Sequence, residues 1–132
     1  MEIYCGTDII EVARIKDAID NTKGFKENIY SVREIGDIDN IKSYMKYERY
    51  AGRFAAKEAI YKAISKLLIE NNINMGFTDI EIENVKELRN RPRVNILNEN
   101  LKKLFEEKNI KIDVSISHVN DNAVANAVAY IE

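Results

Sequence analysis

The chain has 132 residues, of which 45% are hydrophobic and 32% are charged, which is typical of one folded domain and excludes a disordered segment. The net charge of −2 gives no indication of nucleic-acid binding. Asp8 and Glu11 interrupt the apolar N-terminal stretch, so we expect no signal peptide and no membrane contact. The single cysteine, Cys5, excludes an internal disulfide and predicts a cytoplasmic protein in which this residue is small and buried. We therefore predict a single domain over residues 1–132.

The N-terminal segment predicts a strand followed by a helix. Residues 2–6 are mostly apolar and typical of a short strand. Asp8 followed three residues later by Glu11 is typical of a helix N-terminus of the capping-box type. Apolar residues then recur at helical spacing, at Ile9, Val12, Ile15 and Ile19.

Two shorter helices are expected next. Gly24 marks a break, after which Phe25 and Ile29 indicate a short helix that returns to the core. Ser31 and Glu34 have the spacing of a second capping box.

One long helix is predicted for the middle of the chain. Residues 38–47 are polar and carry no clear pattern, but residues 48–70 contain no proline and many alanines. A helix of roughly 22 residues would extend about 33 Å, the width of the whole domain. Asn71 and Asn72 are expected to end it.

The C-terminal half predicts strands. We expect strands over 77–85 and 94–96, a turn at Pro92, a helix over 98–105, and a hairpin of residues 110–118 and 123–131. The last strand is rich in alanine, which favours close packing against the long helix. The pattern predicts an α+β fold in which a small, mostly antiparallel sheet packs against one long central helix plus shorter helices.

Four charged residues distinguish the long helix. Arg53 and Lys57 stand four residues apart, as do Glu58 and Lys62, so we expect the charges to line one broad edge. An acid among bases suits a divalent cation that carries a phosphate. The alternative is a surface Glu58–Lys62 pair worth about 0.3–0.5 kcal/mol.

Two further residues are candidates for the same site. Asp8 is either a helix cap or a ligand, and the two roles are compatible because a strand-to-helix junction suits phosphate or metal binding. Carboxylates from two elements, here Asp8 and Glu58, are what Mg²⁺ usually takes from a protein. His118 either closes its strand or contacts a phosphate. One cysteine and one histidine offer no zinc site.

These residues lie in three stretches that together resemble the holo-[acyl carrier protein] synthase family, the small bacterial class of 4′-phosphopantetheinyl transferases. The first stretch is residues 6–15, with Gly-Thr-Asp followed by Arg-Ile. The second is residues 50–59, Tyr-Ala-Gly-Arg-Phe-Ala-Ala-Lys-Glu-Ala, followed by Lys62 and Ala63. The third is residues 114–118, Val-Ser-Ile-Ser-His, before the hairpin. Order and spacing agree over nearly the whole chain.

The resemblance implies a reaction in which phosphopantetheine moves from coenzyme A to a serine hydroxyl of apo acyl carrier protein, with release of adenosine 3′,5′-bisphosphate. It implies that Asp8 and Glu58 bind Mg²⁺ at the pyrophosphate, and that Lys62 neutralises charge on the leaving phosphate. Phosphoryl transfer requires that the enzyme position the reacting groups and neutralise their charge, more than that it form a covalent intermediate. The base that takes the serine proton is either Glu58 or a water positioned by the metal.

The resemblance also implies how the substrates are held. Arg53 and His118 would bind the 3′-phosphate of coenzyme A, with Lys57 and Arg91 beside the coenzyme. Arg14 would contact the acidic helix of the carrier protein. A homotrimer with active sites between neighbouring subunits is implied as well.

Two other functions remain open at this point. One is a non-catalytic module that binds a carrier protein or a nucleotide on the same scaffold, which the unusual turns after Lys62 and at Asn90-Arg91 would favour. The other is a metal-dependent enzyme that uses a different nucleotide.

Overall fold

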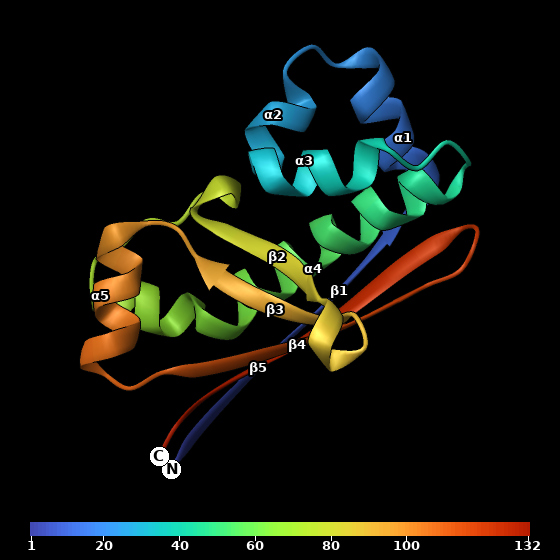
Figure 1. Ribbon diagram of the computed structural model, residues 1–132. Helices are drawn as coiled ribbons and strands as arrows, with labels where there is room; N and C mark the ends of the chain where they lie inside the picture. The colour runs from blue at the N-terminus through green and yellow to red at the C-terminus, as the bar shows by residue number, and fades with distance from the viewer.

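One long helix, α4, crosses the face of a three-stranded sheet, and three short helices cover its N-terminal half (Figure 1). The computed structural model describes all residues, 1–132. The elements in chain order are β1 (Glu2–Glu11), α1 (Val12–Asn21), α2 (Phe25–Ile29), α3 (Val32–Asp39), α4 (Met45–Glu70), the 3₁₀ turn η1 (Phe77–Asp79), β2 (Ile80–Val85), the 3₁₀ turn η2 (Lys86–Leu88), β3 (Arg91–Ile96), α5 (Glu99–Glu107), β4 (Lys111–His118) and β5 (Asn122–Ile131). None of the helices combines the length and apolarity that crossing a membrane requires.

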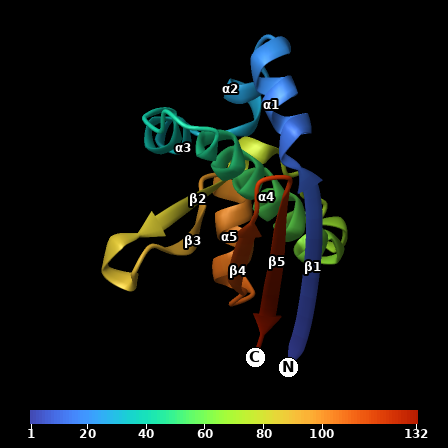
Figure 2. The same ribbon diagram turned by 90° about the vertical axis from the view of Figure 1, so that its right-hand side faces the viewer.

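The larger sheet has the strand order β1-β5-β4, and both pairings are antiparallel (Figure 2). The strands β2 and β3 form a separate antiparallel pair. In the larger sheet Asp8 is opposite Ala125, and His118 is opposite Ala123. β5 is therefore central, and β1 and β4 are the two edges. The predicted α+β fold, the long helix and the C-terminal hairpin are confirmed.

Small residues allow α4 and the sheet to pack closely. The contact consists mainly of alanines, at Ala55, Ala56, Ala59 and Ala63 of α4 and Ala123, Ala125, Ala127 and Ala129 of β5, each at most 2% exposed. Small side chains on both surfaces bring the two backbones near each other and leave little empty volume. The predicted packing of the alanine-rich last strand against the long helix is confirmed.

Side-chain caps start two of the helices. Ser31 accepts a hydrogen bond from the Glu34 amide, and the Glu34 carboxylate accepts one from the Ser31 amide, as the predicted capping box requires. Asn98 accepts from the Leu101 amide and starts α5, also as predicted.

The first strand differs from the prediction. β1 continues to Glu11 because its backbone pairs with β5 along its whole length, from Glu2 opposite Ile131 to Glu11 opposite Asn122. Asp8 therefore lies inside a strand and caps no helix, and α1 begins at Val12 without a side-chain cap. A side-chain cap at Asp8 would provide hydrogen bonds for one or two backbone amides, whereas pairing with β5 provides them for many.

Alternation along β1 also overturns the prediction for Cys5. Tyr4, Gly6 and Asp8 face α4, so Cys5 lies on the opposite face of the sheet, where it is exposed.

Three other element boundaries differ. α4 begins at Met45, three residues before the predicted start. Residues 77–79 form a 3₁₀ turn, and the strand follows at Ile80. Pro92 lies inside β3, and the chain reverses before it, where Arg89 and Asn90 have positive φ angles of 58° and 64°. A proline is accepted here because it lies near the start of a two-stranded ribbon.

Candidate active site

Asp8, Glu58 and Lys62 lie together at the β1 edge of the sheet, and we call them the carboxylate cluster. The Lys62 ammonium is 3.1 Å from Asp8 Oδ1 and donates to the Thr7 carbonyl at 2.9 Å. Lys62 therefore pairs with Asp8, and Lys62 and Glu58 form no ion pair of the simple surface type. The side chain of Asp8 is 15% exposed and that of Lys62 is 50% exposed, so the cluster is accessible to a ligand.

A glycine brings β1 and α4 close enough to form this cluster. A Cβ atom on Gly6 would lie 2.0 Å from the Ala59 carbonyl oxygen and 2.7 Å from the Ala63 nitrogen, so only glycine fits. Asp8 is two residues further along β1 and faces the same way as Gly6. It therefore reaches the helix surface beside Lys62.

The carboxylate cluster carries an excess of negative charge. Burial is the main cause that raises the pKa of Glu58, the nearby Asp8 charge raises it further, and Lys62 partly opposes both. Two carboxylates share one lysine, so a cation would be favoured. The chain contains no group of three or more acidic, histidine or cysteine ligands. The donor set fits Mg²⁺, which takes one or two carboxylates and completes its shell with water and phosphate oxygens.

A pocket of about 240 Å³ opens directly beside Glu58. It lies between the outer surface of α4 and the segment that leads into η1. Half of its lining residues are hydrophobic, and the full set is Lys57, Glu58, Tyr61, Met75, Gly76 and Phe77. The pocket therefore offers a partly apolar surface next to Glu58.

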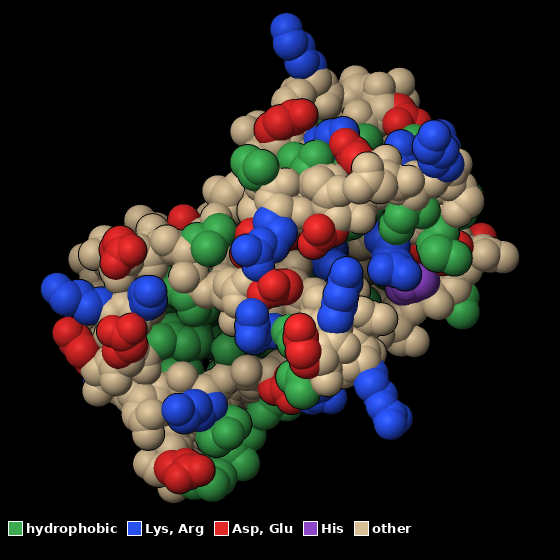
Figure 3. Space-filling view, in the orientation of Figure 1, with side chains coloured by type: hydrophobic (Ala, Val, Ile, Leu, Met, Phe, Trp, Pro, Cys, Tyr) green, Lys and Arg blue, Asp and Glu red, His purple; other side chains and the backbone are tan.

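A second, basic pocket lies at the β4 edge of the sheet. Its volume is about 340 Å³, and its lining residues are Arg49, Gly52, Arg53, Asn84, Asn90, Pro92, Ile116 and His118. Figure 3 shows the histidine beside arginine and lysine side chains on this face. Gly52 allows β4 to approach α4, since a Cβ atom there would lie 2.9 Å from Ile116 Cγ2.

Arg53 gives the basic pocket its clearest chemical character. It is only 5% exposed, its buried Nε has no hydrogen-bond partner, and no carboxylate forms an ion pair with it. Burial lowers the pKa of Arg53, because the charged form loses hydration. A buried, unpaired guanidinium is costly in free energy. A bound anion would supply the missing acceptor, so the basic pocket fits a phosphate group.

Lys57 is held by partners inside the protein, although it also contributes to the lining of the pocket beside Glu58. Its side chain is fully buried and forms a 2.7 Å ion pair with the equally buried Glu34. It also donates to the carbonyls of Ile29, Phe77 and Ile80. Burial lowers its pKa, and Glu34 opposes that shift. With four acceptors around it, the ammonium has no hydrogen left for a ligand.

The charges of α4 do not share one edge, contrary to the prediction. Arg53 and Glu58 are five positions apart, which turns them by about 140° around the helix. Arg53 therefore faces the basic pocket, whereas Glu58 and Lys62 face β1. Within one chain, the helix α4 therefore separates the carboxylate cluster from the basic pocket.

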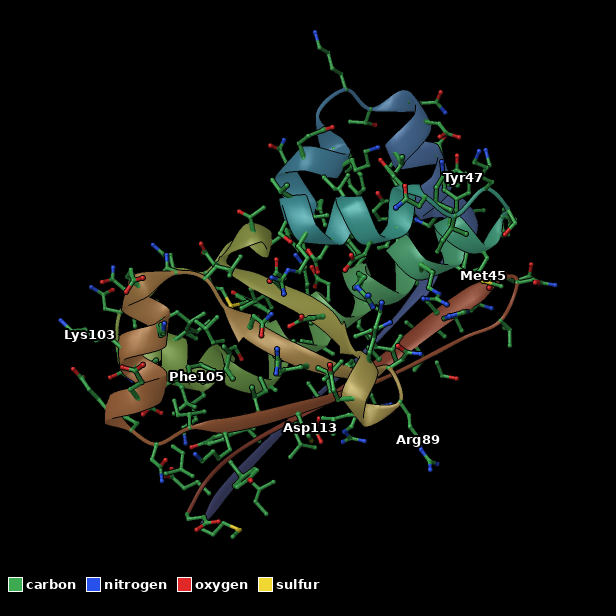
Figure 4. All side chains as sticks on the ribbon, viewed as in Figure 1. Met45, Tyr47, Arg89, Lys103, Phe105 and Asp113 are labelled. Carbon is green, nitrogen blue, oxygen red and sulfur yellow. The ribbon has the colours of Figure 1, made fainter.

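Two other predicted residues, Arg91 and Arg14, belong neither to the carboxylate cluster nor to the lining of the basic pocket. The exposed Arg91 forms an ion pair with Asp113, while its neighbours Asn90 and Pro92 line the basic pocket. Figure 4 labels Asp113 and the nearby Arg89 on this side of the molecule. Arg14 is exposed on α1 and forms no ion pair.

Sequence reasoning did not identify Arg49, Asn84 and Asn90 as pocket residues. Arg49 had a signal, because it stands one helical turn before Arg53. The two asparagines had none, since only the folding of β2 and β3 over α4 brings them there.

An α+β fold that places paired carboxylates and a lysine on one side of its central helix, and a buried arginine on the other, fits a protein that acts on phosphate esters. The model of the 4′-phosphopantetheinyl transferase superfamily matches residues 4–127, and the chain belongs to that superfamily. Within it, the chain is similar to holo-[acyl-carrier-protein] synthases, as its motifs predict.

The relatives match over nearly their full lengths. The Clostridium tetani holo-[acyl-carrier-protein] synthase is 41% identical, and the match covers 97% of this chain and 95% of the relative. The Fusobacterium nucleatum enzyme of the same name is also 41% identical and is covered to 98%. A Bacillus anthracis holo-(acyl-carrier-protein) synthase structure, in complex with CoA (3′,5′-ADP), is 32% identical with a TM-score of 0.75, covering 98% of this chain and 96% of that one.

Proposed function

We propose that this chain is a holo-[acyl-carrier-protein] synthase, which transfers 4′-phosphopantetheine from coenzyme A to a serine of apo acyl carrier protein. The observation that carries the proposal is the carboxylate cluster, in which Asp8, Glu58 and Lys62 lie together beside the pocket at Glu58. The family membership and the coenzyme A complexes of relatives support the same reaction.

The cluster fits a substitution at phosphorus. The serine oxygen forms a bond to the phosphorus that carries pantetheine, and the bond from that phosphorus to the bridging oxygen breaks, which releases adenosine 3′,5′-bisphosphate. Lys62 neutralises negative charge that develops on the leaving phosphate. Asp8 and Glu58 would hold Mg²⁺, which when bound supplies charge neutralisation at the pyrophosphate. Glu58 is also a candidate for taking the serine proton, with a positioned water as the alternative.

The two pockets suit the two ends of coenzyme A. The pocket beside Glu58 is half hydrophobic and fits the uncharged pantetheine arm. The basic pocket, with Arg53 and His118, fits the 3′-phosphate. The 3′-phosphate and the pyrophosphate are attached to the same ribose. The carboxylate cluster and the basic pocket must therefore come close to each other around one coenzyme molecule.

The helix α4 lies between the carboxylate cluster and the basic pocket of the same chain. One chain is therefore poorly arranged to hold a single coenzyme molecule with both of these sites. We therefore infer a homotrimer in which the β1 edge of one subunit meets the β4 edge of the next, a repeated contact that can close into a ring. The outer face of the sheet offers apolar surface for such an assembly, since Ile3, Ile9 and Val128 are 66%, 63% and 43% exposed.

A mixing experiment tests the shared site. Asp8→Asn damages the carboxylate cluster and Arg53→Met damages the basic pocket, which are the two halves of the shared site. We expect both purified variants to be nearly inactive. When they are unfolded together and refolded as a mixture, about a quarter of the sites receive both intact halves. We expect the transfer rate of the mixture to recover to about that fraction of the wild-type value.

The matched control is a mixture of Asp8→Asn with Glu58→Gln, which damage the same half and should show no recovery. If the first mixture also stays inactive while both variants assemble normally, each site is built within one chain.

The acyl carrier protein is the proposed partner, and the exposed Arg14 on α1 remains the candidate for its acidic helix. The cytoplasmic location and the absence of nucleic-acid partners remain predictions from composition.

The direct test of the proposed function uses intact mass. The purified chain is incubated with apo acyl carrier protein, coenzyme A and Mg²⁺, and the carrier is weighed by mass spectrometry. We expect a gain of one phosphopantetheine, and no gain after EDTA is added. No gain with several carrier proteins, together with retained binding of coenzyme A, would instead establish the non-catalytic binding module.

A further inference from the structure

The proposed function gives no role to Glu48, although this residue contacts His118. Glu48 Oε2 lies 3.1 Å from His118 Nδ1, and the two side chains are 12% and 28% exposed. Glu48 lies in the first turn of α4, and His118 is the last residue of β4. Met45, labelled in Figure 4, marks this turn of α4 near the end of the β4–β5 hairpin.

The chemistry of this contact determines where the His118 proton lies. An ionised carboxylate can only accept a hydrogen bond, so Nδ1 of the ring is the donor. In the neutral ring with hydrogen on Nδ1, the other nitrogen, Nε2, carries a lone pair and repels a phosphate oxygen. Only the doubly protonated ring donates from Nε2 as well.

The other charged groups that line the pocket with His118 are cations. From α4 the ring faces Arg49 and Arg53, both lining the same pocket, and from the β2–β3 side the pocket contributes only uncharged residues. Glu48 is the only acidic residue hydrogen-bonded to the ring.

We propose that Glu48 is a positioning residue, which accepts a hydrogen bond from Nδ1 of His118 and so fixes the ring for Nε2 to donate to a phosphate in the basic pocket. Phosphate binding is then coupled to proton uptake by His118. This inference rests on the proposed function, because it takes the ligand to be the 3′-phosphate of coenzyme A or its bisphosphate product.

Because His118 is the only histidine of the chain, its ring signals identify themselves. NMR titration of the ring nitrogens follows its protonation in the free protein. Calorimetry with adenosine 3′,5′-bisphosphate at several pH values between about 6.5 and 8.5 measures affinity across the range in which an imidazole changes charge. The titration of the ligand's own phosphate is common to all variants, so only differences between variants are interpreted.

We expect Glu48→Gln to move the ring titration to lower pH and to weaken bisphosphate binding about tenfold at the acidic end of the range. The loss should shrink as pH rises, because the wild-type ring also becomes neutral. Glu70→Gln is the matched control, since it makes the same change near the far end of α4, where Glu70 pairs only with the exposed Lys66. It should leave both measurements unchanged.

A purely structural role for Glu48 gives a different result. A negative charge in the first turn of a helix is favourable in itself, so Glu48→Gln lowers the melting temperature under either account. If the variant lost affinity equally at every pH while the ring titration stayed in place, the proposal would be wrong. If the wild-type chain bound no bisphosphate at any pH, the proposed function would fail, and the ring titration would still test the coupling of Glu48 to His118.

Discussion

Replacing Glu58 by glutamine is expected to lower kcat/KM for carrier-protein modification on the order of a thousandfold. The amide keeps the size of the side chain but removes one of the two charges that would hold Mg²⁺. Asp8→Asn should have an effect of similar size, because Asp8 supplies the second charge and also orients Lys62 through the 3.1 Å contact. The loss is measured from the rate at which apo carrier protein gains mass.

Both variants should stay folded, because the pKa of Glu58 is raised first by burial and then by repulsion from Asp8, and removing either charge relieves that repulsion. Thermal unfolding of Glu58→Gln and of the control Glu70→Gln checks this point. Near-normal turnover in both Glu58→Gln and Asp8→Asn would remove these residues from the metal site. It would leave the family membership untouched.

The second large effect concerns stability. Lys57→Met is expected to lower the free energy of unfolding by about 3–5 kcal/mol, because it leaves the Glu34 charge buried without its partner. Methionine fills the space of the lysine stem but offers no hydrogens to the carbonyls of Ile29, Phe77 and Ile80. Urea unfolding followed by circular dichroism measures the loss.

The double variant Lys57→Met with Glu34→Gln separates the charge from the packing. The two oxygens of Glu34 accept from the Ser31 and Ile82 amides respectively, so glutamine keeps an acceptor for only one of them. We expect the double variant to regain part of the lost stability, since no charge remains buried. If Lys57→Met kept its stability but lost affinity for coenzyme A, Lys57 would contact the ligand after all, as the resemblance implies.

Local sequence was sufficient for the elements whose signals are local. The long helix could be predicted because residues 48–70 contain no proline and many alanines, and the hairpin because Asn120 to Asn122 interrupt two apolar runs. The extent of β1 could not be predicted, because it depends on pairing with β5 more than a hundred residues away. The same pairing removed Asp8 from its expected role as a helix cap.

The candidate site could also be predicted only in part from the sequence. The family motifs indicated Asp8, Glu58 and Lys62, and the fold brings these three together. The burial of Lys57 could not be predicted, because in a sequence a lysine that binds a phosphate looks like one that pairs with Glu34. Asn84 and Asn90 reach the basic pocket only through tertiary contacts between α4 and the β2–β3 pair, whereas Arg49 stands one helical turn before Arg53.

The position of α4 between the carboxylate cluster and the basic pocket has a consequence for how activity depends on protein concentration. If each site needs one half from each of two neighbours, a closed ring has as many complete sites as subunits, an open chain has one fewer, and an isolated subunit has none. Catalytic output per molecule should then fall more steeply on dilution than mass action on the substrates predicts. Holding the ring together would be as much a part of catalysis as the residues that contact the coenzyme.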